Sequence, residues 1–229
     1  MGGSGSERDK GRAILLVIII GLIIAICVCG VMLWKMMRGS GQGEDFWDLV
    51  AENDEVIAWL TVDDTAIDTP VAQADNNTKY LNTDARGKQT LTGCPFLDYR
   101  NSPDFTDRYS IVYGHNVEDH LMFGDLELFT DEEFWKEERT GRLLLKDRTE
   151  YDIEFFACVK TKEDDSRYFD PRKVRNNWNE DYLEELTENA LVAEDSIDMS
   201  DNVLVLSTCK EADSKERILL IGRLKPTGE

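Results

Sequence analysis

Histidine is scarce in this chain, since only His115 and His120 occur among 229 residues. We also find no internal repeat and no low-complexity tract. The acidic runs Asp131–Glu133 and Glu163–Asp165 lack the alternating oxygen ligands and the central glycine of a calcium-binding loop. The sequence therefore predicts neither a metal site nor a cofactor.

Basic residues are also in short supply. The chain has 26 lysines and arginines against 46 aspartates and glutamates, and its net charge is −20. The segment 44–229 alone carries 21 basic and 44 acidic residues, or about −23. Nucleic acids and anionic lipid head groups are bound through basic surfaces, so we expect neither to bind this segment. We interpret the acidity as a soluble, self-repelling surface.

One long stretch lacks charge altogether. Residues 13–34 form an apolar run of 22 residues. At 1.5 Å per residue, a helix of this length covers about 33 Å, which is enough to cross a hydrocarbon core of about 30 Å. Because Val31–Lys35 offers no small-residue cleavage site, we expect an uncleaved membrane anchor instead of a removed signal peptide.

The charges that flank the apolar run predict its orientation. Three basic residues precede the run and two follow it, Lys35 and Arg38. This excess predicts a cytoplasmic N-terminus and an extracellular bulk, in a single-pass protein of the cell membrane. The 186 residues after the linker have the length of one domain. The expected segments are a cytoplasmic N-terminus 1–12, a transmembrane helix 13–34, a linker 35–43 and an extracellular domain 44–229.

The domain after the linker has the pattern of a β-rich α+β fold. Apolar residues at helical spacing predict one or two short helices over 44–60. Short β-like runs separated by turns follow, and a period of four from Trp178 to Ala190 predicts a late helix. We expect a mostly antiparallel closed sheet or barrel with peripheral helices. The expected strands lie at 66–67, 70–72, 93–99, 109–113, 142–146, 151–160, 202–206 and 217–224.

Two apolar runs near the C-terminus flank a cysteine. Residues 202–206 and the run that begins at Arg217 are joined by a mostly polar stretch, which predicts an antiparallel pair. Pairing residues by constant sum places Cys209 opposite Arg217. The same register places Arg223 opposite Val203, farther along the strand. A neighbouring cation favours thiolate over thiol, so Cys209 is a candidate nucleophile; alternatively, it is a small buried hydrophobe.

One of the two histidines lies at the end of a strand. His115 belongs to the run YGHN, which follows an apolar stretch, and strand ends often carry catalytic groups on a rigid scaffold. His120 lies in the charged stretch VEDH and is expected to be a loop residue. A cysteine nucleophile, a strand-end histidine and an arginine are the three parts that acyl transfer through a thiol needs. Cys209, His115 and Arg217 are therefore the candidate catalytic residues.

Three motifs resemble those of the sortase family, most closely class B. LSTC at Leu206–Cys209 matches the family pattern, with Val205 in place of its leading threonine. The other two are YGHN at Tyr113–Asn116 and ERILLIGRL from Glu216. The stretch that begins NDEVIAWL, the run GCPFLDYRN and the run HNVEDHLMFGDL also resemble class B sortases. The similarity extends over essentially all of 44–229.

The resemblance implies a sortase β-barrel with an N-terminal helical extension, and a transpeptidase reaction. In that reaction the sorting signal of a surface protein is cut and joined to an amine of the peptidoglycan precursor. Cys209 would form a thioester, His115 would act as general acid and then as base, and Arg217 would stabilise the oxyanion. Arg223 is the competing arginine. Residues beside the motifs are candidates for the substrate groove: Ser207, Thr208, Leu97, Tyr80 and Asn82.

Three alternatives stay open. A thiol hydrolase would use the same Cys209 and His115 but would let water resolve the thioester. A membrane-tethered binding module would keep Cys209 in its core. Within the family, a pilin-polymerising enzyme would use a lysine side chain as the amine. A disulfide between Cys94 and Cys158 is also open, because nothing in the sequence brings the two together.

Overall fold

The computed structural model describes residues 19, 22, 46–117, 121–137, 139–193, 198–209 and 215–227. The chain divides into two units, Met1–Phe46 and Trp47–Glu229. In the first unit, Ile19 and Leu22 are helical and exposed, and the rest of the expected anchor 13–34 lies outside the described residues. Within the described ranges, no helix combines the length and the hydropathy needed to cross a bilayer.

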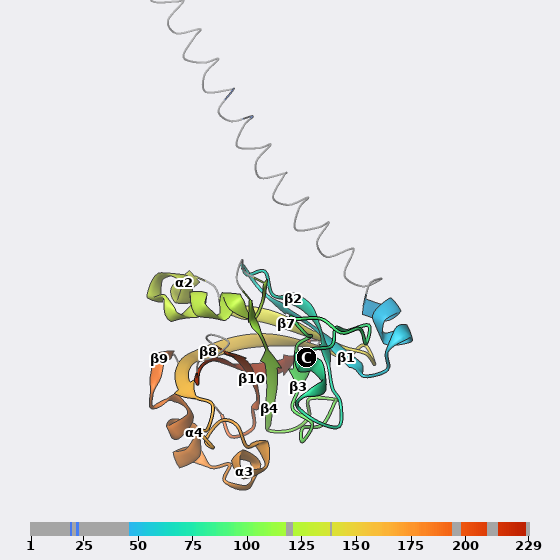
Figure 1. Ribbon diagram of the computed structural model, residues 1–229. Coiled ribbons are helices and arrows are strands. Elements are labelled where there is room, and N and C mark those ends of the chain that lie inside the picture. The colour runs from blue at the N-terminus through green and yellow to red at the C-terminus, as the bar shows by residue number, and fades with distance from the viewer. Residues whose placement is uncertain are drawn as a thin grey trace, which may run out of the picture. The chain divides into compact units, whose positions relative to one another are not determined.

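The second unit is a closed β-barrel (Figure 1). The strand order is β11-β10-β4-β3-β2-β1-β7-β8-β9, and a further pairing of β11 with β8 closes the first eight strands into a ring. This confirms the predicted barrel. The strands of the large sheet are β1 (Val56–Val62), β2 (Asp68–Ala72), β3 (Phe96–Leu97), β4 (Tyr109–Gly114), β7 (Thr140–Leu145), β8 (Glu150–Lys162), β9 (Ala190–Ala193), β10 (Asn202–Cys209) and β11 (Glu216–Pro226); β5 (Asn116–Val117) and β6 (Leu121–Met122) pair separately.

Short helices surround the barrel. Figure 1 shows α3 and α4 together on one side of it and α2 on another. Side chains cap the N-termini of α3 and α4. Asp170 accepts a hydrogen bond from the Lys173 amide at 3.3 Å, and Asn179 accepts one from the Tyr182 amide at 2.9 Å. The helices are η1 (Lys79–Leu81), η2 (Gly124–Thr130), α2 (Glu132–Glu137), α3 (Pro171–Asn176) and α4 (Glu180–Thr187), and residues 46–52 are also helical.

Two sequence-based expectations about helices are partly wrong. The segment 44–60 is helical only over 46–52, and Val56–Val62 is strand β1. Adjacent β-branched residues favour extended backbone there, and pairing with both β2 and β7 outweighs the helical spacing. The late helix α4 ends at Thr187, because Ala190 begins β9 and pairs with β8.

Strand β10 is buried on both faces. Leu204 and Leu206 belong to the core inside the barrel, to which all eight strands of the ring contribute. Val203 and Val205 belong to a second core, which also holds side chains of α3 and α4 such as Leu186. Alternating side chains therefore enter two different cores. This explains why the strand has a continuous apolar sequence instead of an alternating one.

The register of β10 confirms the pairing deduced from the sequence. Cys209 lies opposite Arg217, and Val203 lies opposite Arg223, in the antiparallel pair with β11. On its other side β10 runs parallel to β4, and β2 also runs parallel to β3. The sheet is therefore mostly antiparallel, as expected, with two parallel pairs that the sequence did not predict.

Gly87 and Gly93 provide a matched pair for testing the loop between η1 and β3. Both adopt left-handed φ values, +78° and +64°. A Cβ atom on Gly93 would lie 2.6 Å from the carbonyl oxygen of Leu81, whereas one on Gly87 would meet nothing within 4 Å. We expect Gly87→Ala to lower the free energy of unfolding by about 1 kcal/mol and Gly93→Ala by about 3 kcal/mol or more. Urea denaturation measures both, and equal losses would contradict the predicted clash.

Cys94 and Cys158 are free and buried, so they do not form the disulfide that the sequence left open. Burial raises the pKa of each thiol to about 12.

Since iodoacetamide reacts with thiolates, it should label Cys94 and Cys158 at pH 8 only after unfolding, as checked by peptide mass spectrometry. The unfolded thiols ionise near pH 8.5, so they should also lower the folding stability as the pH rises from there towards 12. Labelling of either cysteine in the folded chain would contradict this expectation.

Candidate active site

The three candidate catalytic residues lie at one edge of three adjacent strands. In the parallel pair of β4 and β10, Gly114 lies opposite Thr208. His115 directly follows β4, and Cys209 is the last residue of β10, so the two lie at the ends of neighbouring strands that run in the same direction. On the far side of β10, the antiparallel β11 places Arg217 opposite Cys209. Pairing alone thus brings together residues that are about a hundred positions apart in the chain.

A cavity of about 330 Å³ opens at this edge. His115 and Arg217 are both in its wall, and Ser207 lies in the wall two residues before Cys209 on β10. The cavity combines apolar and aromatic side chains with a few charged groups, which is the usual composition of a ligand site. The described lining residues are Asn77, Leu81, Phe96, Arg100, Tyr113, Gly114, His115, Glu163, Phe169, Ser207 and Arg217.

The His115 ring is fixed by a backbone carbonyl. Its Nε2 lies 2.9 Å from the carbonyl oxygen of Leu81 at the end of η1. A carbonyl oxygen only accepts hydrogen bonds, so Nε2 is the donor and carries a proton. The other nitrogen, Nδ1, is left as the one that can gain or lose a proton as the ring changes charge.

The same carbonyl is packed closely against Gly93. An added Cβ there would meet the carbonyl oxygens of both Tyr80 and Leu81. In addition, the amide of Cys94 donates a hydrogen bond to the Tyr80 carbonyl at 3.0 Å. The loop therefore holds the hydrogen-bond acceptor of His115 in place through backbone contacts that only glycine permits.

Arg217 is held by two oxygen acceptors. Its Nη2 lies 2.6 Å from Oε2 of Glu163, and its Nη1 donates to the Glu216 carbonyl at 3.0 Å. The Arg217 side chain is 15% exposed, so its charge sits in a largely desolvated wall, while Glu163 is 44% exposed. Sequence reasoning did not assign Glu163 to the site. Its place next to the start of β11 follows from the pairing of Glu216 with Lys162, which no local pattern reveals.

Of the five residues proposed for the substrate groove, Ser207 lies in the described cavity wall. Thr208 and Leu97 are buried, and Leu97 belongs to the core inside the barrel. The hydroxyl of Tyr80 is directed to Glu55, with an O···O distance of 2.6 Å, and Asn82 uses its backbone carbonyl to accept a hydrogen bond within the loop. A role in the substrate groove stays a prediction for all five residues.

Two residues next to these candidates do line the cavity. They are Leu81, which lies between Tyr80 and Asn82, and Phe96, which precedes Leu97. On β3 the side chains of successive residues point to opposite faces, so Phe96 faces the cavity when Leu97 faces the core. Sequence proximity to a motif thus named segments that line the cavity, but it did not give the direction of each side chain.

Arg223 and His120 are the arginine and the histidine that the sequence analysis left outside the catalytic set. Arg223 lies opposite Val203, six residues along the strand from Arg217, and its Nε is 3.4 Å from Oε2 of Glu154. The register thus confirms that Arg217, and not Arg223, is the arginine beside position 209. His120 lies outside the described residues.

No family model matches this chain, but individual relatives do. Sortase B of Listeria monocytogenes is 32% identical to it over 184 residues, which cover 79% of this chain and 74% of that protein. Sortase B of Staphylococcus aureus is 26% identical over 187 residues, covering 78% of this chain and 74% of that protein.

Solved structures agree with these relatives. A Streptococcus pyogenes class B sortase involved in pilus biogenesis has a TM-score of 0.76 and 34% identity, covering 80% of this chain and all of that one (100%). A Staphylococcus aureus sortase B–substrate complex has a TM-score of 0.72 at 24% identity, covering 85% of this chain and 92% of that one, and it supports the fold alone. Given the identity and the coverage of the Listeria relative, this chain belongs to the sortase B family of cysteine transpeptidases.

Proposed function

We propose that Cys209, His115 and Arg217 carry out acyl transfer on the C-terminal sorting signal of a surface protein. The observation that carries this proposal is the register of three adjacent strands. β11 places Arg217 opposite Cys209, and β4 ends beside Thr208, so that His115 follows next to the cysteine. The cavity at the same edge supports binding of a peptide there.

In the first half of the reaction, the Cys209 thiolate attacks the carbonyl carbon of the scissile peptide bond. A carbon–sulfur bond forms, and the carbonyl oxygen becomes an oxyanion. When the intermediate collapses, the carbon–nitrogen bond breaks and the departing amine takes a proton from the His115 imidazolium. With Nε2 bound to the Leu81 carbonyl, Nδ1 is the nitrogen that releases this proton.

In the second half, an amine attacks the thioester. Neutral His115 accepts the proton of the attacking amine, a carbon–nitrogen bond forms, and Cys209 leaves as thiolate. The products are the joined peptide and an enzyme with its starting charges. If water attacks in place of the amine, the same steps give hydrolysis, so the transferase outcome depends on amine access to the cavity.

Arg217 is proposed to stabilise the oxyanion in both halves. Its contacts with Glu163 and the Glu216 carbonyl fix the guanidinium in the cavity wall before substrate binds. A charge that is already oriented stabilises a developing negative charge with little reorganisation, and a desolvated wall strengthens that interaction.

The amine acceptor and the cellular setting are also proposals. We propose an amine of the peptidoglycan precursor as the nucleophile, reached by an extracellular domain on a single-pass anchor at residues 13–34. The apolar run and the basic residues before it support the anchor. A transpeptidase cuts one peptide bond and forms another, so membership of the sortase B family supports a peptide substrate for this chain.

A pilin-polymerising role is the second candidate. The observation that favours it is the 34% identity to the Streptococcus pyogenes class B sortase involved in pilus biogenesis. In this case the nucleophile would be a lysine side chain of another subunit instead of a wall amine.

The three proposed roles can be tested with the full-length chain in detergent micelles. A quenched-fluorescence library of pentapeptides is supplied with triglycine or with a lysine-containing peptide, and mass spectrometry records enzyme adducts and products. We expect a thioester adduct on the wild type but none on Cys209→Ala. His115→Ala and Arg217→Ala should each lower kcat/KM by about 100-fold or more, because each removes a group that acts in the transition state.

Arg223→Ala is the matched control for Arg217→Ala, because it removes an arginine from the same strand that pairs with Glu154. It should leave kcat/KM within about threefold of the wild type, because Arg223 lies opposite Val203 and is not a lining residue of the described cavity. Near-normal turnover by any of the three catalytic variants would overturn its role. Product joined to triglycine favours wall anchoring, product joined to lysine favours pilin polymerisation, and hydrolysed peptide alone would favour the hydrolase.

The anchor has a separate test. A variant that lacks residues 1–43 should move from the membrane pellet to the soluble fraction on ultracentrifugation, because it loses the apolar run of 22 residues. The full-length chain should stay in the pellet after a high-salt wash, which strips proteins that are held only by charge. Recovery of the full-length chain in the supernatant would refute the anchor.

A further inference from the structure

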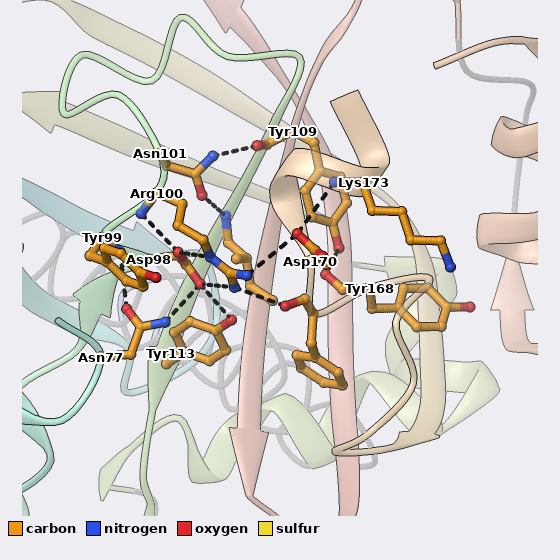
Figure 2. A network of polar contacts seen from close by, with 12 residues as sticks. Asn77, Asp98, Tyr99, Arg100, Asn101, Tyr109, Tyr113, Tyr168, Asp170 and Lys173 are labelled. Atoms are coloured by element: carbon orange, nitrogen blue, oxygen red, sulfur yellow. Dashed lines mark hydrogen bonds and ion pairs between the residues drawn. The ribbon is translucent and has the colours of Figure 1, made fainter. Parts of the chain in front are cut away.

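The side-chain carboxylate of Asp98, which is not one of the three proposed catalytic groups, accepts five hydrogen bonds. Asp98 follows β3 and is fully buried, with 0% of its surface exposed. Its oxygens accept hydrogen bonds from the Arg100 amide (2.9 Å), Nε (2.8 Å) and Nη2 (2.7 Å). They also accept one from Asn77 Nδ2 (2.8 Å) and one from the Tyr113 hydroxyl (3.0 Å). Figure 2 shows these groups converging on the carboxylate.

The carboxylate is charged in spite of its burial. Burial by itself favours the protonated form, but the hydrogen bonds from Arg100 and Asn77 hold the pKa of Asp98 below its usual value. A buried carboxylate is costly unless all of its lone pairs are engaged, and here five donors engage them. Such a group fixes its partners in place, because moving any one of them leaves a buried charge underpaired.

The three described residues that donate to the side-chain carboxylate of Asp98 all line the cavity. Asn77, Arg100 and Tyr113 are lining residues from three separate segments of the chain. Arg100 extends the network further, since its Nη2 also donates to the carbonyl of Phe169 at 2.9 Å, and Phe169 is a lining residue as well. One carboxylate is thus connected to four of the groups that shape the cavity.

The ring of Tyr113 joins this network to two aromatic neighbours. It lies between Phe96, at 5.4 Å between ring centroids, and Phe169, at 6.4 Å. We call the five lining residues Asn77, Phe96, Arg100, Tyr113 and Phe169 the aromatic wall. Tyr113 is its middle member, and it is two residues before His115 on the same chain segment. The wall faces the space that the peptide would occupy and contains none of the three proposed catalytic groups.

We infer that Asp98 is a positioning residue that pre-organises the aromatic wall for binding of the sorting peptide. The inference rests on the proposed function, because it concerns the same cavity. Asn77 and Phe169 lie outside helices and strands, so without the carboxylate the peptide would have to order them as it binds, and that ordering weakens affinity. The chemistry at His115 and Arg217 does not pass through Asp98. Its loss should therefore change binding more than turnover.

Asp98→Asn tests this inference because it keeps the size of the side chain and removes its charge. We expect the variant to raise the KM for the best-cleaved peptide of the pentapeptide library by about tenfold, the effect of losing one strong charged hydrogen bond. The kcat should stay within about threefold. Alkylation of Cys209 by iodoacetamide at pH 8 should keep its wild-type rate, which a general loosening of the site would alter.

Asp125→Asn is the control for the loss of a buried carboxylate. Asp125 is 3% exposed and accepts a hydrogen bond from the Ala66 amide at 2.6 Å, and it is not among the described lining residues. Its substitution should lower stability but leave KM within about twofold of the wild type. A KM for Asp98→Asn that matches this control would overturn the inference.

Tyr113→Phe provides a second test that does not need Asp98→Asn to be stable. It removes only the hydroxyl that donates to Asp98. If Asp98 acts through the wall, Tyr113→Phe alone should raise KM, and adding it to Asp98→Asn should raise KM little further. An unchanged KM in Tyr113→Phe, or two effects that multiply, would overturn the inference. If the wild type itself forms no thioester with any peptide, the proposed function fails, which is a different result from a wild type that reacts with no Asp98 dependence.

Discussion

The position of the whole site depends on the pairing of β10 with two different partners. β4 pairs with it in parallel and β11 in antiparallel orientation. Parallel neighbours end at the same edge, and an antiparallel neighbour begins there. The two pairings therefore place the ends of β4 and β10 beside the start of β11. This arrangement is rigid because both faces of β10 are covered, one by the core inside the barrel and the other by the core beneath α3 and α4. A slip of the register by one residue would exchange the two faces, and buried strands resist such a slip strongly.

The charges around the cavity are held in pairs. In the first pair, Arg100 belongs to the aromatic wall and Asp98 lies behind it, fully buried. The pair of Glu163 and Arg217 lies at the rim, where Glu163 is partly in water. Ion pairs of the first kind contribute little net stability, because desolvation offsets the attraction, but they penalise any rearrangement. Those at the rim can exchange partners at lower cost, since water replaces what is lost. Of the two pairs at the cavity, one therefore has a fully buried carboxylate, and the other has a partly solvated carboxylate that orients the largely desolvated guanidinium of Arg217.

The sequence predicted those features that depend on local pattern and simple pairing. The opposition of Cys209 and Arg217 followed from two apolar runs and a constant sum, and the closed barrel followed from many short strands. The sequence did not predict β1, because its apolar residues also match helical spacing and only pairing with β2 and β7 decides the outcome. It also named Leu97 as a groove candidate, whereas the neighbouring Phe96 lines the cavity, since the face of a two-residue strand cannot be deduced from its own sequence.

Residues missed in the site share a physical reason. Glu163, Arg100 and Phe169 enter the cavity wall from segments that are adjacent only in the folded chain. Arg100 and Asp98 are two residues apart and could have been noticed as an ion pair, but nothing local shows that their other partners are Asn77 and Phe169. Such long-range polar contacts carry no periodic signal, so they were open to inference only from the structure.

The geometry also links the proposed base to a residue without any reactive group. His115 is oriented by the Leu81 carbonyl, and that carbonyl lies where a side chain on Gly93 would be. A backbone acceptor has no pKa of its own near neutrality, so unlike a carboxylate it fixes the tautomer of the ring without adding a negative charge beside the imidazolium. The cost is that the acceptor cannot be adjusted by changing a side chain. Its position depends on the path of the loop, and the left-handed φ of Gly93 sets that path. The orientation and the tautomer of His115 therefore depend on the conformation of this loop, and so on Gly93, which does not touch the ring through a side chain.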